Sequence, residues 1–145
     1  LKNINLVKDM HFMLQQEVAE RITAQSGSKT YGRLSVMLQY YCETQLLLKI
    51  GSGAFSPPPK VESALIRLMP RKQRALVAQD EYLLGVVVKL AFGQRRKTIA
   101  NSLKKYLVAQ TLKTLGINPQ TRPEQLSVDD FVLISNEIKR GEGSI

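Results

Sequence analysis

Two stretches of the chain hold residue types that could take part in chemistry. The first is an aromatic residue, Phe55, followed by Ser56 and the proline run Pro57–Pro59. Each proline fixes its own φ and biases the preceding residue toward extended conformations, so a stiff arm of polyproline type is predicted. Such an arm could hold the Phe55 ring against a flat ligand. The alternative, which the residue types alone favour, is that Phe55 fills the core beside a tight connection.

The second stretch is basic and holds the candidate phosphate-binding residues Arg95, Arg96, Lys97, Lys104 and Lys105. Residues 71–106 contain nine of the 21 Lys and Arg residues but only two of the 12 Asp and Glu residues. We predict a helix over residues 94–105, with Ile99, Leu103 and the following Tyr106 on one apolar face. Another face holds a basic stripe of Lys97, Asn101, Lys104 and Lys105, which lies next to Arg95 and Arg96. The stripe could contact several phosphates at once, and the alternative is an ordinary solvated helix face.

Other catalytic or metal-binding sets are not predicted. One histidine, His11, and one cysteine, Cys42, cannot make a zinc site from these ligands or an intrachain disulfide. We expect Cys42 to be a buried structural thiol and the protein to be cytoplasmic, where thiols stay reduced. Glu17 and Glu20 are interpreted as surface residues, not as an acid–base pair. No signal peptide and no membrane-spanning run are expected.

The overall composition points to a folded protein with an anionic partner. The hydrophobic content of 43% can fill a core, while the formal net charge is +9 and the pI is about 9.9. A strongly basic balance favours nucleic acid as the partner, with an anionic membrane surface as the second choice.

The first half of the chain is predicted to be α/β. A strand over residues 10–14 is followed by helices over 15–24 and 32–43, and then by strands over 44–50 and 61–69. The last two strands are expected to pair antiparallel. We interpret this order as the later part of an α/β sheet that ends in an antiparallel strand pair.

The second half of the chain is predicted to be all-α. A basic linker over residues 70–74 precedes a helix that Asp80 caps and Gly93 ends. Residues 111–115 are expected to be helical up to Gly116. A last helix is expected to begin after Ser127, to run to about Lys139 and to be ended by Gly141. The expected domains are therefore residues 1–70 and 71–145.

Four stretches together resemble one family. The run from Ala54 to Ala64 (Ala-Phe-Ser-Pro-Pro-Pro-Lys-Val-Glu-Ser-Ala) closely resembles a signature of the ribosomal RNA adenine dimethyltransferases. The run from Ala91 to Leu103 is similar to the basic helix that follows in that family. Asp9–Arg21 and Tyr31–Val36 look like its bacterial, KsgA-type branch. The resemblance covers residues 8–138.

The resemblance implies an enzyme that uses S-adenosylmethionine to dimethylate two adjacent adenines in small-subunit (16S) ribosomal RNA. It implies a Rossmann-like methyltransferase domain followed by a small helical domain, acting on the assembling small ribosomal subunit. Phe55 would stack on the target adenine, because a base that leaves its own stack gains from an aromatic face. Arg95, Arg96 and Lys97 would contact the RNA backbone, with Lys104 and Lys105 as weaker candidates.

The chain also departs from the family pattern. The glycine-rich cofactor loop, the acidic ribose-binding residue and the Asn-Leu-Pro-Tyr motif of the family are absent, and Gly93 and Ala100 replace an expected polar and an expected basic residue. The first residue is Leu1. We therefore expect a C-terminal portion that lacks the cofactor-binding half and is inactive alone. The alternatives are a noncatalytic ribosomal RNA-binding or ribosome-assembly module, and a resistance methyltransferase that acts on large-subunit RNA.

Overall fold

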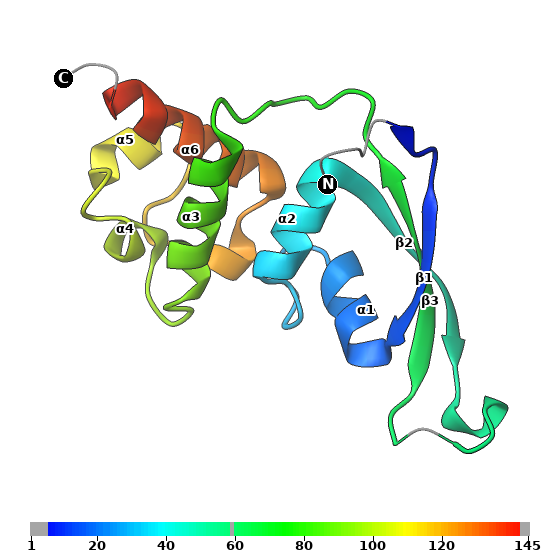
Figure 1. The fold of residues 1–145 in the computed structure, drawn as a ribbon. Coiled ribbons are helices and arrows are strands. Elements are labelled where there is room, and N and C mark those ends of the chain that lie inside the picture. Colours follow the sequence, from blue (N-terminus) through cyan, green and yellow to red (C-terminus); the bar gives the residue numbers. More distant parts are fainter. Residues whose placement is uncertain (1–5, 59, 143–145) are drawn as a thin grey trace.

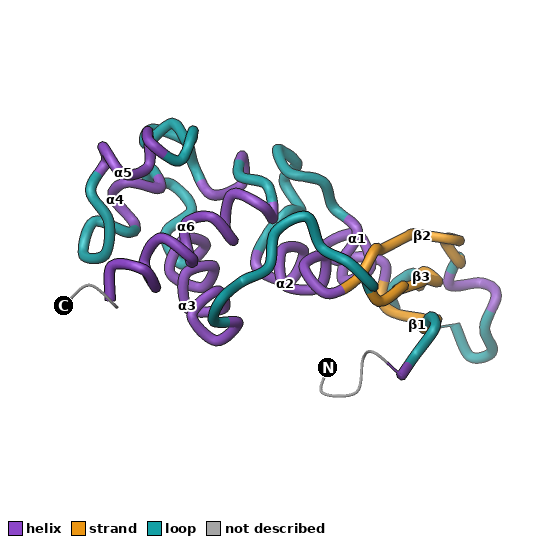
Figure 2. The backbone as a smooth tube through the Cα atoms, turned by 90° about the horizontal axis from the view of Figure 1, so that it is seen from above, coloured by secondary structure: helices purple, strands orange, loops and turns teal. Residues whose placement is uncertain are grey.

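The computed structural model describes residues 6–58 and 60–142. A small sheet lies at one end of the molecule and a group of helices at the other, with α1 and α2 between them (Figures 1 and 2). In chain order, the strands and α-helices are β1 (Met10–Gln15), α1 (Gln16–Thr23), α2 (Arg33–Tyr41), β2 (Cys42–Ile50), β3 (Ser63–Pro70), α3 (Glu81–Phe92), α4 (Ile99–Ser102), α5 (Ala109–Thr114) and α6 (Val128–Glu142).

The sheet has the strand order β1-β3-β2, and its central strand is antiparallel to both neighbours. The expected antiparallel pair of the last two strands is therefore confirmed, and β1 lies on the other side of β3. Ala64, Ile66 and Leu68 alternate along β3 and are buried, which is the pattern of a strand with one covered face. Phe12 is opposite Ile66 in the register, so β1 presents its even-numbered residues to the same face.

Two buried clusters hold the chain together. The smaller cluster lies between α1 and the sheet, and its members are Ala19, Ile22, Cys42, Ala64, Ile66 and Leu68. The larger cluster joins α2 to the helices that follow residue 70, with Val36, Leu84 and Phe131 among its fully buried members. Tyr41 packs against both clusters. Helix α2 thus contributes to the helical core although it precedes residue 70 in the sequence.

Two predicted helix ends differ in the structure. Helix α2 was predicted to run to residue 43, but it ends at Tyr41 because Cys42 has an extended backbone and starts β2, opposite Pro70. Helix α6 was predicted to end at Gly141, but it continues through that residue to Glu142. Gly141 has no positive φ, so it does not form the left-handed cap with which glycine often ends a helix.

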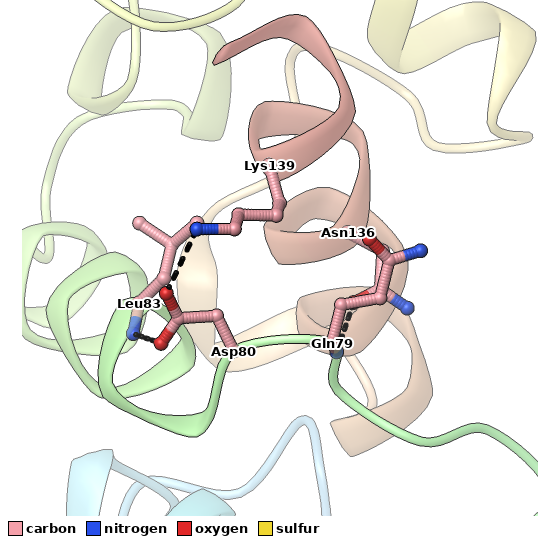
Figure 3. Close-up of polar contacts among 5 residues, drawn as sticks. All are labelled: Gln79, Asp80, Leu83, Asn136 and Lys139. Atoms are coloured by element: carbon pink, nitrogen blue, oxygen red, sulfur yellow. Dashed lines mark hydrogen bonds and ion pairs between the residues drawn. The ribbon is translucent and has the colours of Figure 1, made fainter. Parts of the chain in front are cut away.

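Helix α3 is fixed to α6 by polar contacts on either side of its cap (Figure 3). The predicted cap is confirmed, since an Asp80 carboxylate oxygen accepts a hydrogen bond of 3.0 Å from the Leu83 N–H. The other Asp80 oxygen lies 3.3 Å from Lys139 Nζ on α6. One residue earlier, the Gln79 N–H donates to Asn136 Oδ1 at 2.9 Å. The cap therefore joins two helices that are far apart in the sequence.

The proline arm differs from a uniform polyproline segment. Its Ser56–Pro57 peptide bond is cis, whereas the polyproline conformation is built from trans bonds. Pro59, the last proline of the predicted arm, lies outside the described residues. Among the residues that the structure describes, no helix is long and apolar enough to cross a membrane.

Candidate nucleic-acid interface

Phe55 lies in the connection between β2 and β3, at an end of the sheet (Figure 1). A single 3₁₀ turn over Ser52–Ala54 closes β2, and the Phe55 N–H donates to the Ser52 carbonyl at 3.3 Å. The ring is half-buried and belongs to neither of the two buried clusters, nor to the partly buried residues packed against them. Among the described residues, Phe55 therefore does not fill either core, which was the alternative to a ligand contact.

The long basic helix predicted over residues 94–105 is wrong. Helix α3 ends at Phe92, residues 93–96 form turns, and α4 has only four residues. The helix is interrupted because Thr98 has an extended backbone and caps a new helix by accepting from the Asn101 N–H at 3.3 Å. Its first N–H groups are also satisfied from outside, since the Ile99 N–H donates to the Thr121 carbonyl at 2.7 Å.

This interruption divides the predicted stripe into two basic turns. Arg95, Arg96 and Lys97 are exposed on the turn that precedes α4, whereas Lys104 and Lys105 are exposed on the turn that follows it. Neither turn lies next to Phe55, because α1 and α2 stand between the sheet and the helices in both views (Figures 1 and 2). The structure therefore keeps the predicted base-binding and phosphate-binding residues apart on one elongated molecule.

A groove of about 650 Å³ lies where α1 and α2 approach the end of α3. Lys29, Arg33 and Arg95 line it together with the apolar side chains of Met37 and Phe92. Arg95 reaches across the groove, since its guanidinium donates to the carbonyls of Lys29 and Tyr31 at 3.3 Å each. The sequence reading missed Lys29 and Arg33. The available signal was that residues 22–42 contain no carboxylate to neutralise them.

One segment of the helical region combines many cations with a lack of carboxylates. Residues 82–123 contain no Asp or Glu, and they contain eight Lys and Arg residues: Lys89, Arg95, Arg96, Lys97, Lys104, Lys105, Lys113 and Arg122. Within the described residues, none of the eight forms an ion pair. By contrast, Arg67 on the sheet lies 2.8 Å from Asp9. The positive charge of this region is available to an external anion.

The two acidic residues of α1 are used within the fold. Glu17 lies 2.7 Å from the Arg21 guanidinium, and Glu20 lies 3.3 Å from Lys49 Nζ. The hydrogen bond from Gln16, together with Lys49, lowers the pKa of Glu20. Both side chains thus form ion pairs with cations of the fold.

The environment of the single thiol, Cys42, disfavours its reactive form. Cys42 is 0% exposed, and burial raises its pKa, which disfavours the nucleophilic thiolate. The described residues also contain no group of three or more His, Cys, Asp or Glu side chains that could hold a metal ion.

The fold and this surface together define a class of protein, in which part of an α/β domain is joined to a basic helical unit suited to a polyanion. The chain belongs to the ribosomal RNA adenine dimethylase family, whose model matches residues 2–140. The structure is accordingly the C-terminal part of a Rossmann-like methyltransferase domain, ending in an antiparallel strand pair and followed by a small all-α region.

Curated relatives agree with this family. The chain is 51% identical over 148 residues to the ribosomal RNA small subunit methyltransferase A of Psychrobacter cryohalolentis, covering 99% of this chain and 52% of the relative. It is 54% identical over 133 residues to the protein of the same name from Coxiella burnetii, covering 92% and 52%. The chain spans about half the length of these relatives.

A solved structure shares the fold. A dimethyladenosine transferase from Plasmodium falciparum matches with a TM-score of 0.80 at 21% identity, over 97% of this chain and 62% of that one. The agreement extends over both the sheet and the helices, because nearly the whole chain is covered.

Proposed function

We propose that this chain is the RNA-facing portion of an enzyme that dimethylates two adjacent adenines in small-subunit ribosomal RNA, acting on the assembling small subunit. The observation that carries the proposal is the set of eight unpaired cations in a segment without carboxylates, within a member of this family. Ribosomal RNA is a polyanion, and exposed Lys and Arg side chains that form no ion pair within the protein keep a positive charge that can neutralise its phosphates.

Phe55 is the proposed contact to the target adenine. Its half-buried ring lies outside both cores, so folding alone does not account for an aromatic residue at this position. A methylated base must leave the RNA stack, and stacking on an aromatic ring returns about 1–3 kcal/mol per base. The role proposed for Phe55 is to hold the extruded adenine, with no part in proton transfer.

The basic turns and the groove are the proposed contacts to the RNA backbone. Arg95, Arg96 and Lys97 share one exposed turn, and Arg95 also lines the groove that contains Lys29 and Arg33. Guanidinium groups can bind phosphate through two hydrogen bonds, which favours arginine at such positions. Residues 1–70 and 71–145 are the proposed methyltransferase and RNA-binding portions, although α2 packs into the helical core.

S-adenosylmethionine is the proposed methyl donor, but the described residues do not supply its site. The glycine-containing stretch Gly51–Gly53 leads into a 3₁₀ turn and the proline arm, and not into the N-terminus of a helix that could hold the cofactor. No step of methyl transfer is therefore assigned to residues of this chain. A noncatalytic RNA-binding module is the alternative function, and a test of methyl transfer in a full-length protein separates the two.

The RNA-binding part of the proposal is tested with the triple variant Arg95→Ala, Arg96→Ala, Lys97→Ala. The measurement is the affinity of the chain for a small-subunit ribosomal RNA fragment over a range of salt concentrations. Loss of phosphate contacts flattens the salt dependence by roughly 0.7–0.9 in logarithmic slope per contact. Lys49→Ala is the control, since Lys49 is paired with Glu20, and it should leave the slope unchanged. An unaltered slope in the triple variant would reject these phosphate contacts.

The catalytic part is tested by methyl transfer in a full-length protein that includes the half its relatives possess. Phe55→Ala should lower the methylation rate by about tenfold or more, while binding to the small subunit changes far less. Phe55→Tyr keeps a ring and should retain most of the rate. Equal rates for Phe55→Ala and the parent protein would reject the stacking role. If neither the parent protein nor its variants methylated RNA, the noncatalytic RNA-binding module would be the remaining function.

A further inference from the structure

The tyrosines differ in whether their side chains have a partner within the fold. Of the five tyrosines, three use their hydroxyl groups in hydrogen bonds within the fold: Tyr31, Tyr40 and Tyr41. The side chains of Tyr82 and Tyr106 make no hydrogen bond or ring contact among the described residues, and these residues are 83% and 51% exposed. Core packing does not explain a half-exposed ring without a partner, although Tyr106 was predicted to lie on the same helical face as Ile99 and Leu103.

The backbone around Tyr106 is anchored although its ring is not. The Tyr106 N–H donates to the Leu103 carbonyl at 2.8 Å, and the Leu103 side chain is fully buried in the helical core. The turn therefore holds Tyr106 on the surface on a fixed backbone. An aromatic ring presented in this way loses little conformational freedom when it binds a flat partner.

The charges beside the two exposed tyrosines are opposite in sign. Lys104 and Lys105 directly precede Tyr106, are exposed and have no ion-pair partner among the described residues. Tyr82, in contrast, follows Asp80 and Glu81. An exposed ring beside free cations matches single-stranded nucleic acid, which offers the face of a base next to phosphates. Tyr82 has the ring but not the cations.

We propose that Lys104, Lys105 and Tyr106 form a second RNA contact, in which the Tyr106 ring stacks on an unpaired base and the two lysines bind the adjoining phosphates. This inference rests on the proposed function in requiring that the chain bind RNA. It adds a site for an unpaired nucleotide on the turn after α4, separate from Phe55. Because bases inside a duplex have no free face, the contact distinguishes unpaired from paired RNA.

The test compares Tyr106→Ala, Tyr106→Phe and Tyr82→Ala in the 145-residue chain. The probes are a short unstructured RNA oligonucleotide and an RNA duplex with the same number of phosphates, each labelled for fluorescence anisotropy. Tyr106→Ala should weaken binding of the unstructured RNA by about fivefold or more and leave duplex binding within about twofold. Tyr106→Phe keeps the stacking face and should bind like the parent chain, as should the control Tyr82→Ala.

Substitution of the two lysines should affect RNA binding differently from substitution of Tyr106. Lys104→Ala with Lys105→Ala should weaken both probes and flatten the salt dependence, whereas Tyr106→Ala should leave the salt slope unchanged because it removes no charge. Unchanged affinity in Tyr106→Ala, or an equal loss on both probes, overturns the stacking contact while leaving the proposed function intact. Failure of the parent chain to bind either RNA overturns both. Circular dichroism of each variant distinguishes loss of a contact from loss of the fold.

Discussion

The guanidinium carbon of Arg74 lies 4.6 Å from the centroid of the Tyr40 ring, and Arg74 Nε donates to the Tyr40 carbonyl at 3.0 Å. The Tyr40 hydroxyl in turn accepts a hydrogen bond of 2.9 Å from the Ala78 N–H. These contacts fix the segment between β3 and α3 to the C-terminal end of α2, where a cation also interacts favourably with the helix dipole. The sheet and the helical region are therefore joined by a segment with specific contacts.

Arg74→Ala should lower the free energy of unfolding by about 1–3 kcal/mol, since it removes a cation–π contact and leaves the Tyr40 carbonyl without this donor. Arg74→Lys keeps the charge but not the planar guanidinium, so an intermediate loss is expected. Urea unfolding measures both. Lys72→Ala is the control, because Lys72 is exposed in the same segment, and it should be neutral. Equal stability of all three variants would show that the segment is not held by Arg74.

The Asp80 cap predicts a pH dependence. The hydrogen bond from the Leu83 N–H, together with Lys139, lowers the pKa of Asp80 below its ordinary value. A group whose pKa is lower in the folded state stabilises the fold fully above its unfolded-state pKa of about 3.9, and this contribution is lost as the pH falls through the folded-state value.

Asp80→Asn should therefore be less stable than the parent chain at pH 7, and the difference should shrink below about pH 4. Denaturant midpoints measured at neutral and acidic pH give this difference directly. A gap of the same size at both pH values would mean that the carboxylate charge contributes nothing, and that only the geometry of the cap matters.

Gly116 is the glycine that ends the α5 region with a positive φ of 81°. Its N–H donates to the Lys113 carbonyl and the Ile117 N–H donates to the Leu112 carbonyl, both at 2.9 Å, which is the paired pattern of a Schellman motif. Gly116→Ala should cost about 1–2 kcal/mol of stability in thermal or urea unfolding, because L-residues disfavour this conformation. Gly141→Ala, inside α6 and without positive φ, should cost nothing, and an equal loss at both positions would contradict the argument.

The sequence predicted the elements where local chemistry decides them. The strand β3, the Asp80 cap and the helix that begins after Ser127 are all present. Ser127 and Asp130 exchange reciprocal hydrogen bonds of 3.0 and 3.1 Å at the start of that helix. The basic helix was wrong because Thr98 caps a new helix, and the first N–H groups of that helix are satisfied in part by a distant segment, since the Thr121 carbonyl accepts the Ile99 N–H. Helical spacing between Ile99 and Leu103 carried no information about that contact.

The groove could not be predicted for a related reason. Its cations come from Lys29 before α2, from Arg33 at the start of α2 and from Arg95 after α3, so the packing of α2 against α3 brings them together. A sequence pattern shows which charges are neighbours in the chain, whereas the cations of this groove are distant in the sequence and become neighbours only in the folded structure. The sequence shows that residues 22–42 contain no carboxylate, but it does not show that the segment with Arg95 packs beside them.

Arg33 and Arg21 line the same groove but differ in pairing, which gives a matched test of its role. Arg21 is neutralised by Glu17 at 2.7 Å, whereas Arg33 has no ion pair among the described residues. Arg33→Ala should therefore weaken binding of a small-subunit ribosomal RNA fragment and flatten its salt dependence by roughly 0.7–0.9 in logarithmic slope for one lost phosphate contact. Arg21→Ala should change the slope much less, because an arginine already paired with a carboxylate releases few counterions from RNA. If the two variants alter the slope equally, pairing within the protein does not decide which cations bind, and the groove contributes only through the net charge of the molecule.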